Sequence, residues 1–196
     1  QTLGEGHVYF PEAGLMGLRW PSPALPGVGM VLLGCHAGWW PEIGHLGPVQ
    51  THVLQAGHAQ RIRWSVLQAQ PQRYAHWLLQ AAAASQQLVR QIALMVHCVQ
   101  NHTLVQRLAS GLLAVRLHNP HSDGWMSLAD LAHWLSCPVA ELQAAAQVLQ
   151  THRAVQWAED ADAGAPLHSL QPQKLASLAC ACHEHLEQDP GSSGSA

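Results

Sequence analysis

The sequence predicts an α+β fold, with a strand-rich N-terminal part and a helical C-terminal part. Three observations predict it. Residues 1–70 contain short apolar runs separated by Gly and Pro, which is typical of small antiparallel strands. Residues 72–100 lack Gly and Pro and repeat a stripe of residues with a 3.5-residue period. Residues 127–155 form two short amphipathic segments separated by Ser136, Cys137 and Pro138.

Five apolar runs are the candidate strands of the N-terminal part. They cover residues 7–10, 15–20, 28–33, 49–54 and 59–62. Their spacing favours a sandwich or barrel. The first run lies only a few residues into the chain, so we expect this barrel to be truncated. The domains that we expect are 1–71 for the strands, 72–100 for a single helix, 101–186 for a helical domain and 187–196 for a flexible tail.

The stripe along residues 72–100 repeats at alternating steps of four and three residues, which is a heptad pattern. Such a stripe can pack on its own domain, but a strict 3.5-residue period favours a partner helix. We therefore predict a helix that forms a symmetric dimer. Its expected interface residues are Tyr74, Leu78, Ala81, Ser85, Leu88, Ile92, Met95 and Val99.

Further elements follow in order. Residues 103–117 predict a second helix, which Pro120 ends because proline cannot continue the helical hydrogen bonds. The two segments within 127–155 match a helix-turn-helix, a motif whose second helix enters the DNA major groove. An acidic, turn-like segment follows at 158–166. We then expect a short strand at 167–170 and a last helix at 172–186.

Composition narrows the function classes. The net charge of −3 gives no electrostatic indication of nucleic-acid binding, and residues 119–185 carry two Lys or Arg side chains against seven Asp or Glu, histidines not counted. The apolar runs are too short for a membrane span, and the first residues do not resemble a secretory signal. Five unevenly spaced cysteines argue against a disulfide framework, so we expect a reduced, cytoplasmic protein. No catalytic motif is found, so we do not expect an enzyme.

One cluster of soft ligands lies near the end of the chain, between Cys180 and His185 (CACHEH). Zinc favours four Cys or His ligands. In a helix, however, Cys180 and Cys182 would point about 200° apart. We therefore expect an ordinary terminal helix, with no metal and no other cofactor.

Five fragments, in this order, resemble the Crp/Fnr family of bacterial transcription regulators. They are HVYFPEAG at 7–14, VGMV at 28–31, NHTLVQRLA at 101–109, the helix-turn-helix, and LACAC at 178–182. The resemblance implies a partial β-roll like that of cyclic-nucleotide-binding domains, a dimerisation helix and a winged helix-turn-helix. It also implies a homodimer on a palindromic DNA site, with RNA polymerase as a further partner and no membrane.

The sequence departs from the family at the effector site. Nucleotide-binding members hold the cyclic phosphate with an arginine, but residues 34–57 contain no Arg or Lys. Iron–sulfur members carry several cysteines ahead of the roll, whereas Cys35 is the only cysteine before Cys98. We therefore expect cyclic nucleotide binding to be lost, and the sequence names no replacement effector.

The recognition helix departs further. The resemblance places the family's base-contacting positions on Val139, Ala140 and Ala144, which offer only apolar contact. Two functions stay open: a divergent regulator that binds DNA, and a descendant that no longer does and acts as a dimerising interaction module. The candidate DNA contacts are Ser127, Val139, Ala140, Glu141, Gln143, Ala144, Gln147 and Arg153.

Overall fold

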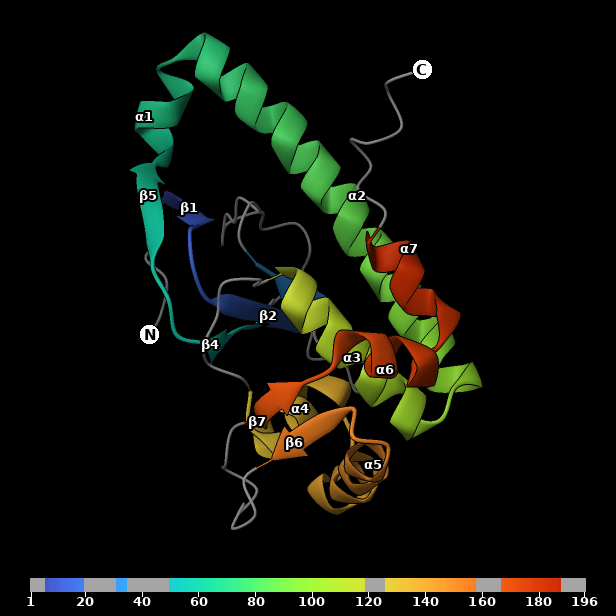
Figure 1. Cartoon of the computed structure of the whole chain (residues 1–196). Coiled ribbons are helices and arrows are strands. Elements are labelled where there is room, and N and C mark those ends of the chain that lie inside the picture. Colours follow the sequence, from blue (N-terminus) through green and yellow to red (C-terminus); the bar gives the residue numbers. More distant parts are fainter. Residues whose placement is uncertain (1–5, 20–30, 35–49, 119–125, 158–166, 188–196) are drawn as a thin grey trace.

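A computed structural model describes residues 6–19, 31–34, 50–118, 126–157 and 167–187 (Figure 1). The N-terminal part contains five strands close to the predicted positions. They are β1 (His7–Pro11), β2 (Leu15–Arg19), β3 (Val31–Leu33), β4 (Gln50–Gln55) and β5 (Ala59–Arg63). β1 pairs with β5, and β2 lies between β3 and β4, with all pairs antiparallel.

The predicted long helix is present as α2 (Pro71–Asn101), preceded by a short helix, α1 (Trp64–Gln68), that was not predicted. Pro71 occupies the first turn of α2, where its missing N–H costs no hydrogen bond. The helix ends because His102 is extended, with φ −124°. In Figure 1, α2 runs diagonally from the strands to the helices of the C-terminal part.

One face of α2 packs on the strands through two apolar clusters. Near its start, Trp77 is buried with Val8 and Leu67. In its second half, partly buried apolar residues of α2 pack on Leu18, Val31 and Leu33. Beside the second cluster, the buried Gln91 accepts a hydrogen bond from the Leu32 N–H (3.0 Å) and donates one to the Leu32 carbonyl (3.2 Å). This side chain therefore completes the edge of β3.

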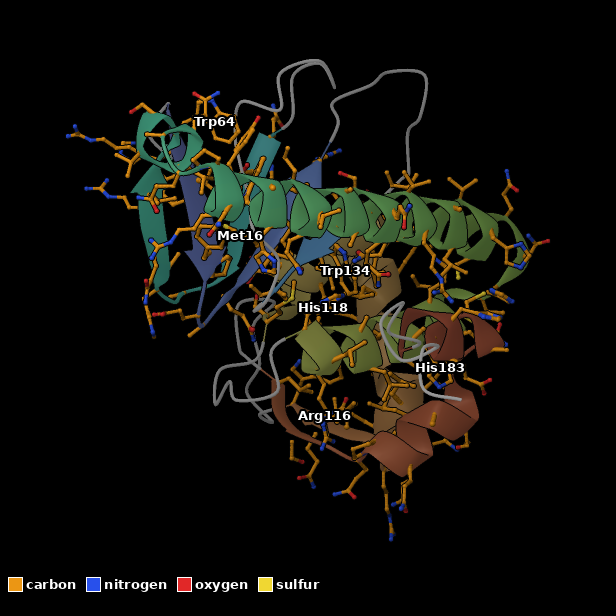
Figure 2. All side chains as sticks on the ribbon, turned by 90° about the horizontal axis from the view of Figure 1, so that it is seen from above. Met16, Trp64, Arg116, His118, Trp134 and His183 are labelled. Atoms are coloured by element: carbon orange, nitrogen blue, oxygen red, sulfur yellow. The ribbon has the colours of Figure 1, made fainter. Side chains whose placement is uncertain are left out.

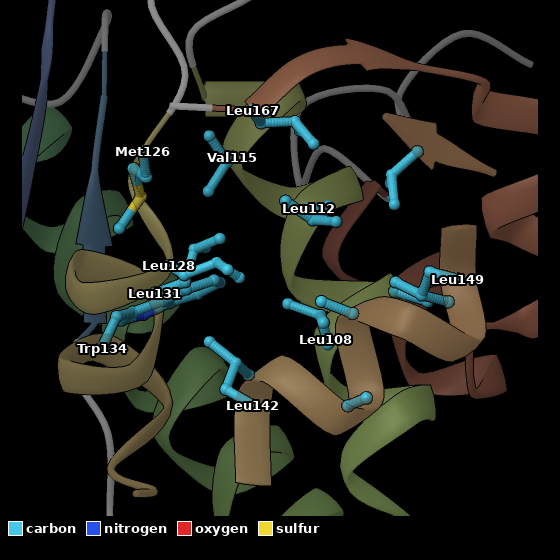
Figure 3. Packing of buried hydrophobic residues seen from close by; sticks show 14 of the residues in the cluster. Leu108, Leu112, Val115, Met126, Leu128, Leu131, Trp134, Leu142, Leu149 and Leu167 are labelled. Carbon is cyan, nitrogen blue, oxygen red and sulfur yellow. The ribbon is translucent and has the colours of Figure 1, made fainter. Parts of the chain in front are cut away.

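The C-terminal part is built on α3 and has the largest core. Its elements are α3 (Leu104–His118), α4 (Leu128–Leu135), α5 (Val139–Thr151), β6 (Val155–Trp157), β7 (Leu167–Leu170), α6 (Pro172–Leu178), a 3-10 turn (Ala181–His183) and α7 (Glu184–Glu187). α3 is buried from Leu108 to Val115. Figure 3 shows Leu108, Leu131, Leu142 and Leu149 converging in this core.

The single last helix predicted at 172–186 is wrong. α6 stops at Leu178, since Ala179 and Cys180 are both extended, with ψ 162° and 155°. The Ser110 hydroxyl of α3 accepts a hydrogen bond from the Cys180 N–H (3.2 Å), so the break leaves no buried donor unpaired there. A short helical segment then resumes and ends in α7.

Several sequence-based expectations lie outside the described residues: the acidic segment at 158–166, most of the effector region at 34–57, and nearly all of the tail at 187–196. Within the described part of the chain, every helix is too short or too polar to cross a lipid bilayer.

Candidate nucleic-acid interface

The predicted break at 136–138 is a tight turn between α4 and α5. Ser127 caps α4 by accepting a hydrogen bond from the Asp130 N–H (3.1 Å). At the other end, Ser136 adopts the left-handed conformation (φ 51°), and its N–H bonds back to the helix. Pro138 then starts α5 in an extended conformation. The two helices are thus held in one arrangement by their termini.

α5 has one buried and one exposed face. Leu142, Ala145, Ala146 and Leu149 are buried against α3 and α4. The opposite face exposes Ala140, Ala144 and Gln147 in one row, at helical steps of four and three. Of the residues not predicted, Thr151 extends the same row, and Val148 lies beside it with 40% exposure. The helical period from Ala144 would have identified both.

The structure separates the candidate DNA contacts into two groups. Val139 is partly buried against the core, and Gln143 is half-buried. Ser127 is engaged at the helix cap, where its hydroxyl also donates to the Asp130 carboxylate (2.7 Å). The candidates on the open surface are Ala140, Glu141, Ala144, Gln147 and Arg153.

The exposed face of α5 has little positive charge. Between residues 126 and 157, Arg153 is the only Lys or Arg, and Glu141 lies in the first turn of the helix. Arg153 is exposed on the turn after α5, where its φ of 54° is in the left-handed region. Because neutralisation of phosphates by Lys and Arg supplies most non-specific affinity, Arg153 is the dominant electrostatic contact available here.

The predicted dimer stripe on α2 is divided between two faces. Tyr74 and Ala81 pack on the cluster around Trp77, while Leu88, Ile92 and Met95 pack on the β3 cluster. Of the remaining three, Ser85 is exposed, and Leu78 and Val99 are 45% and 38% exposed. Intramolecular packing thus accounts for five of the eight positions.

The α2 residues that pack inward include Trp77, Ala81, Leu88, Gln91 and Met95. A second heptad stripe lies one residue on from these positions, toward the outer side of the helix, and shares four residues with the predicted stripe. Among its large apolar members Val89 is the most exposed, at 66%. The stripe is apolar or small at every position, and none of these residues belongs to the fully buried core. Its members are Leu78, Ala82, Ser85, Val89, Ile92, Val96 and Val99, of which Ile92 also packs on the β3 cluster.

An apolar pocket of about 80 Å³ lies under the second half of α2. Figure 2 shows Trp134 and His118 beneath this helix, and both line the pocket. Burial lowers the pKa of His118 to about 4, so the ring is neutral at pH 7. The pocket wall is therefore uncharged on this side.

Thiols border the same pocket. Cys98 and Cys182 line it, and Cys180 lies beside them, with 3.7 Å between the Cys98 and Cys180 sulfurs. Burial raises the pKa of Cys98 and, more weakly, that of Cys182, so both are protonated thiols unless a cation is bound. The sequence analysis expected no metal here because a continuous helix would separate Cys180 and Cys182. In the structure this helix is broken after Leu178, so that reason no longer applies.

Comparison with family models and with curated proteins gives no match. Solved structures of regulators do match the fold. FixK2 from Bradyrhizobium japonicum has a TM-score of 0.55 and 17% identity, covering 90% of this chain and 88% of its own. TTHB099, a CRP-family transcriptional regulator from Thermus thermophilus, has a TM-score of 0.61 and 14% identity, covering 89% and 88%.

A third match is CLP, a c-di-GMP-responsive global regulator from Xanthomonas campestris, with a TM-score of 0.54 and 11% identity, covering 84% of this chain and 85% of its own. At such low identity the likeness concerns the fold alone. It extends from the strands through α2 to the helices that follow. The structural resemblance of this chain to Crp/Fnr-type regulators, first indicated by five sequence fragments, thus holds over about 90% of its length.

Proposed function

We propose that this protein is a homodimeric, cytoplasmic transcription regulator of the Crp/Fnr type that binds DNA through α5, and not an enzyme. The observation that carries the proposal is the exposed face of α5, held by the capped turn after α4 in a fold similar to known regulators. In this proposal the strands form the partial β-roll, and β6 and β7 form the wing. α2 joins two chains, so that the two α5 helices reach successive major grooves.

The test is selection of bound sequences from genomic DNA, followed by titration of the selected site with salt. A palindrome should be enriched, and affinity should fall steeply as salt rises. Arg153→Ala should reduce the slope of log affinity against log salt by about 2 per dimer, since each lost phosphate contact is worth about 0.9. The dependence of DNA affinity on salt should not change when cyclic AMP, cyclic GMP or cyclic di-GMP is added, because cyclic nucleotide binding is proposed to be lost.

The control is Arg73→Ala, which removes the same charge from an exposed position at the start of α2. It should leave the salt slope of the selected site unchanged. If no sequence is enriched at about 50 mM salt, where screening is weak, the DNA-binding proposal fails.

The second candidate is a dimerising interaction module that no longer binds DNA. It is favoured by the absence of Lys and Arg from α5, together with an intact apolar core behind that helix. Folding needs this core in both candidates, so the core does not distinguish the DNA-binding regulator from the interaction module. This candidate predicts a stable dimer that enriches no DNA sequence.

Both candidates place the dimer contact on the outer stripe of α2. Val89→Asp should therefore convert the dimer to a monomer without unfolding the chain, because Val89 is 66% exposed in the single chain. A carboxylate from each chain would be desolvated at the interface, which we expect to weaken association by about 100-fold or more. Light scattering at tens of micromolar gives the mass, and circular dichroism gives the helix content.

Two substitutions on the same helix make the result specific. Ala83→Asp adds the same charge at an exposed position outside the stripe and should leave the dimer intact. Leu88 faces the β3 cluster, so Leu88→Asp should unfold the N-terminal part of the chain by placing a carboxylate in that cluster. A Val89→Asp chain that remains dimeric would place the interface elsewhere.

A further inference from the structure

Four potential metal ligands meet where the end of α2 approaches the C-terminal segment. Cys98 and His102 come from α2 and its cap, while Cys180 and Cys182 come from the break after α6. One ligand atom of each lies within 4.8 Å of every other. The fold thus brings together residues about 80 positions apart, and the α7 end of the C-terminal segment lies beside α2 in Figure 1.

The local backbone explains why the side chains converge. Cys98 and His102 are four residues apart, which places them on one side of α2. Cys180 is extended and Cys182 lies in the 3-10 turn that follows it; both side chains are buried, and Ala181 between them is exposed. The sharp end of α6 therefore removes the divergence that a helix would impose on the two thiols.

The distances are close to those of a tetrahedral ion. Ligands at zinc–sulfur and zinc–nitrogen bond lengths lie about 3.8 Å apart for two sulfurs and about 3.6 Å apart for sulfur and nitrogen. The Cys98 and Cys180 sulfurs are 3.7 Å apart, and the Cys182 sulfur is 3.9 Å from His102 Nδ1. Rotations that bring the longer pairs in by about 1 Å complete the tetrahedron.

We propose that these four side chains, three thiolates and one imidazole, bind one divalent ion of the zinc class as a closed structural site. The set is one of the ligand combinations that zinc uses in structural sites. Each thiol releases its proton to solvent as the ion binds. Four protein ligands leave no open position for substrate, so the ion is not a catalytic centre.

A neighbouring group orients one of the ligands. The Ser110 hydroxyl lies 3.1 Å from the Cys180 sulfur and also accepts the Cys180 N–H. Such contacts to a ligand sulfur hold it in place before the metal arrives. The ion would then fasten the C-terminal segment to the end of α2 and close one side of the apolar pocket, which Cys98 and Cys182 both line.

The test measures metal on the full-length chain. The protein is purified under reducing conditions with zinc present, dialysed, and analysed for metal by elemental mass spectrometry. One zinc ion per chain is expected, and Cys182→Ser should reduce the content to background. Cys137→Ser should keep full occupancy, since Cys137 is half-buried outside the cluster.

Cobalt provides a second measurement that does not depend on how the variant folds. Cobalt(II) added to the metal-free wild-type chain should give the visible bands of a tetrahedral thiolate site, saturating at one ion per chain. A chelator should also make three further thiols accessible to a thiol reagent. Failure to saturate at one ion, or equal loss of zinc in Cys137→Ser, would overturn the proposal. The proposal would also be overturned if the intact mass of the metal-free chain were lower by two hydrogen atoms and a reducing agent restored it. That result would identify a disulfide between two of the cysteines.

Discussion

Gln91→Met should destabilise the chain by about 2–4 kcal/mol, although it removes no charge and keeps the length of the side chain. Gln91 is 5% exposed and bonds both backbone groups of Leu32. Methionine has a similar length but leaves the Leu32 N–H and carbonyl buried without partners, and each unsatisfied group costs about 1–3 kcal/mol. Burial of the more apolar side chain offsets part of that loss. Urea unfolding followed by circular dichroism measures the change.

Gln86→Met is the matched control, because Gln86 lies exposed on the same helix. It should change the free energy of unfolding by less than about 0.5 kcal/mol. The loss in Gln91→Met should be concentrated at the contact between α2 and β3. Amide exchange at Leu32 should therefore accelerate more than exchange in α5. Equal stability of the two variants would show that the Gln91 bonds contribute nothing net.

Leu142→Ala should cost about 3 kcal/mol, within the range of about 2–5 kcal/mol seen for buried leucine truncations. Leu142 is completely buried where α5 faces α3 and α4, among the residues labelled in Figure 3. Removing three carbon atoms loses their transfer free energy and leaves a cavity that the surrounding helices fill only in part. The midpoint of urea unfolding should fall while its slope stays unchanged.

Val148→Ala provides the comparison on the same helix, because Val148 is 40% exposed. It should cost less than about 0.5 kcal/mol. If Leu142→Ala also cost less than about 1 kcal/mol, the core behind α5 would not be as tightly packed as its burial indicates. The presentation of α5 would then require another support.

Local sequence predicted the elements well where Gly, Pro and periodicity mark them. The strands begin and end within a few residues of the apolar runs, and Pro71 and Pro138 mark the starts of α2 and α5. α1 was missed because five residues are too few to establish a helical period. The last helix was predicted too long because residues 172–186 contain no Gly and no proline after the first position.

The candidate sites depended on contacts that the sequence does not encode locally. The Ser110 hydroxyl, 70 residues away, supports the break at Cys180 and so creates the thiol cluster. On α2, two stripes one residue apart share the same heptad period. Periodicity alone therefore could not separate the stripe that packs on the chain's own strands from the one left outside.

The inward-facing residues and the outer stripe of α2 together limit which insertions and deletions this helix can accept. One residue inserted between Ala84 and Ser85 would turn the second half of α2 by about 100° and carry the residues that pack on β3 toward the outside of the helix. Deleting seven residues, about two turns, would leave the second half of α2 facing nearly the same direction but would shorten the helix by about 10.5 Å. The Gln91 contact and the Trp77 cluster could then not form together. Insertions and deletions should therefore be restricted to the segments that flank this helix.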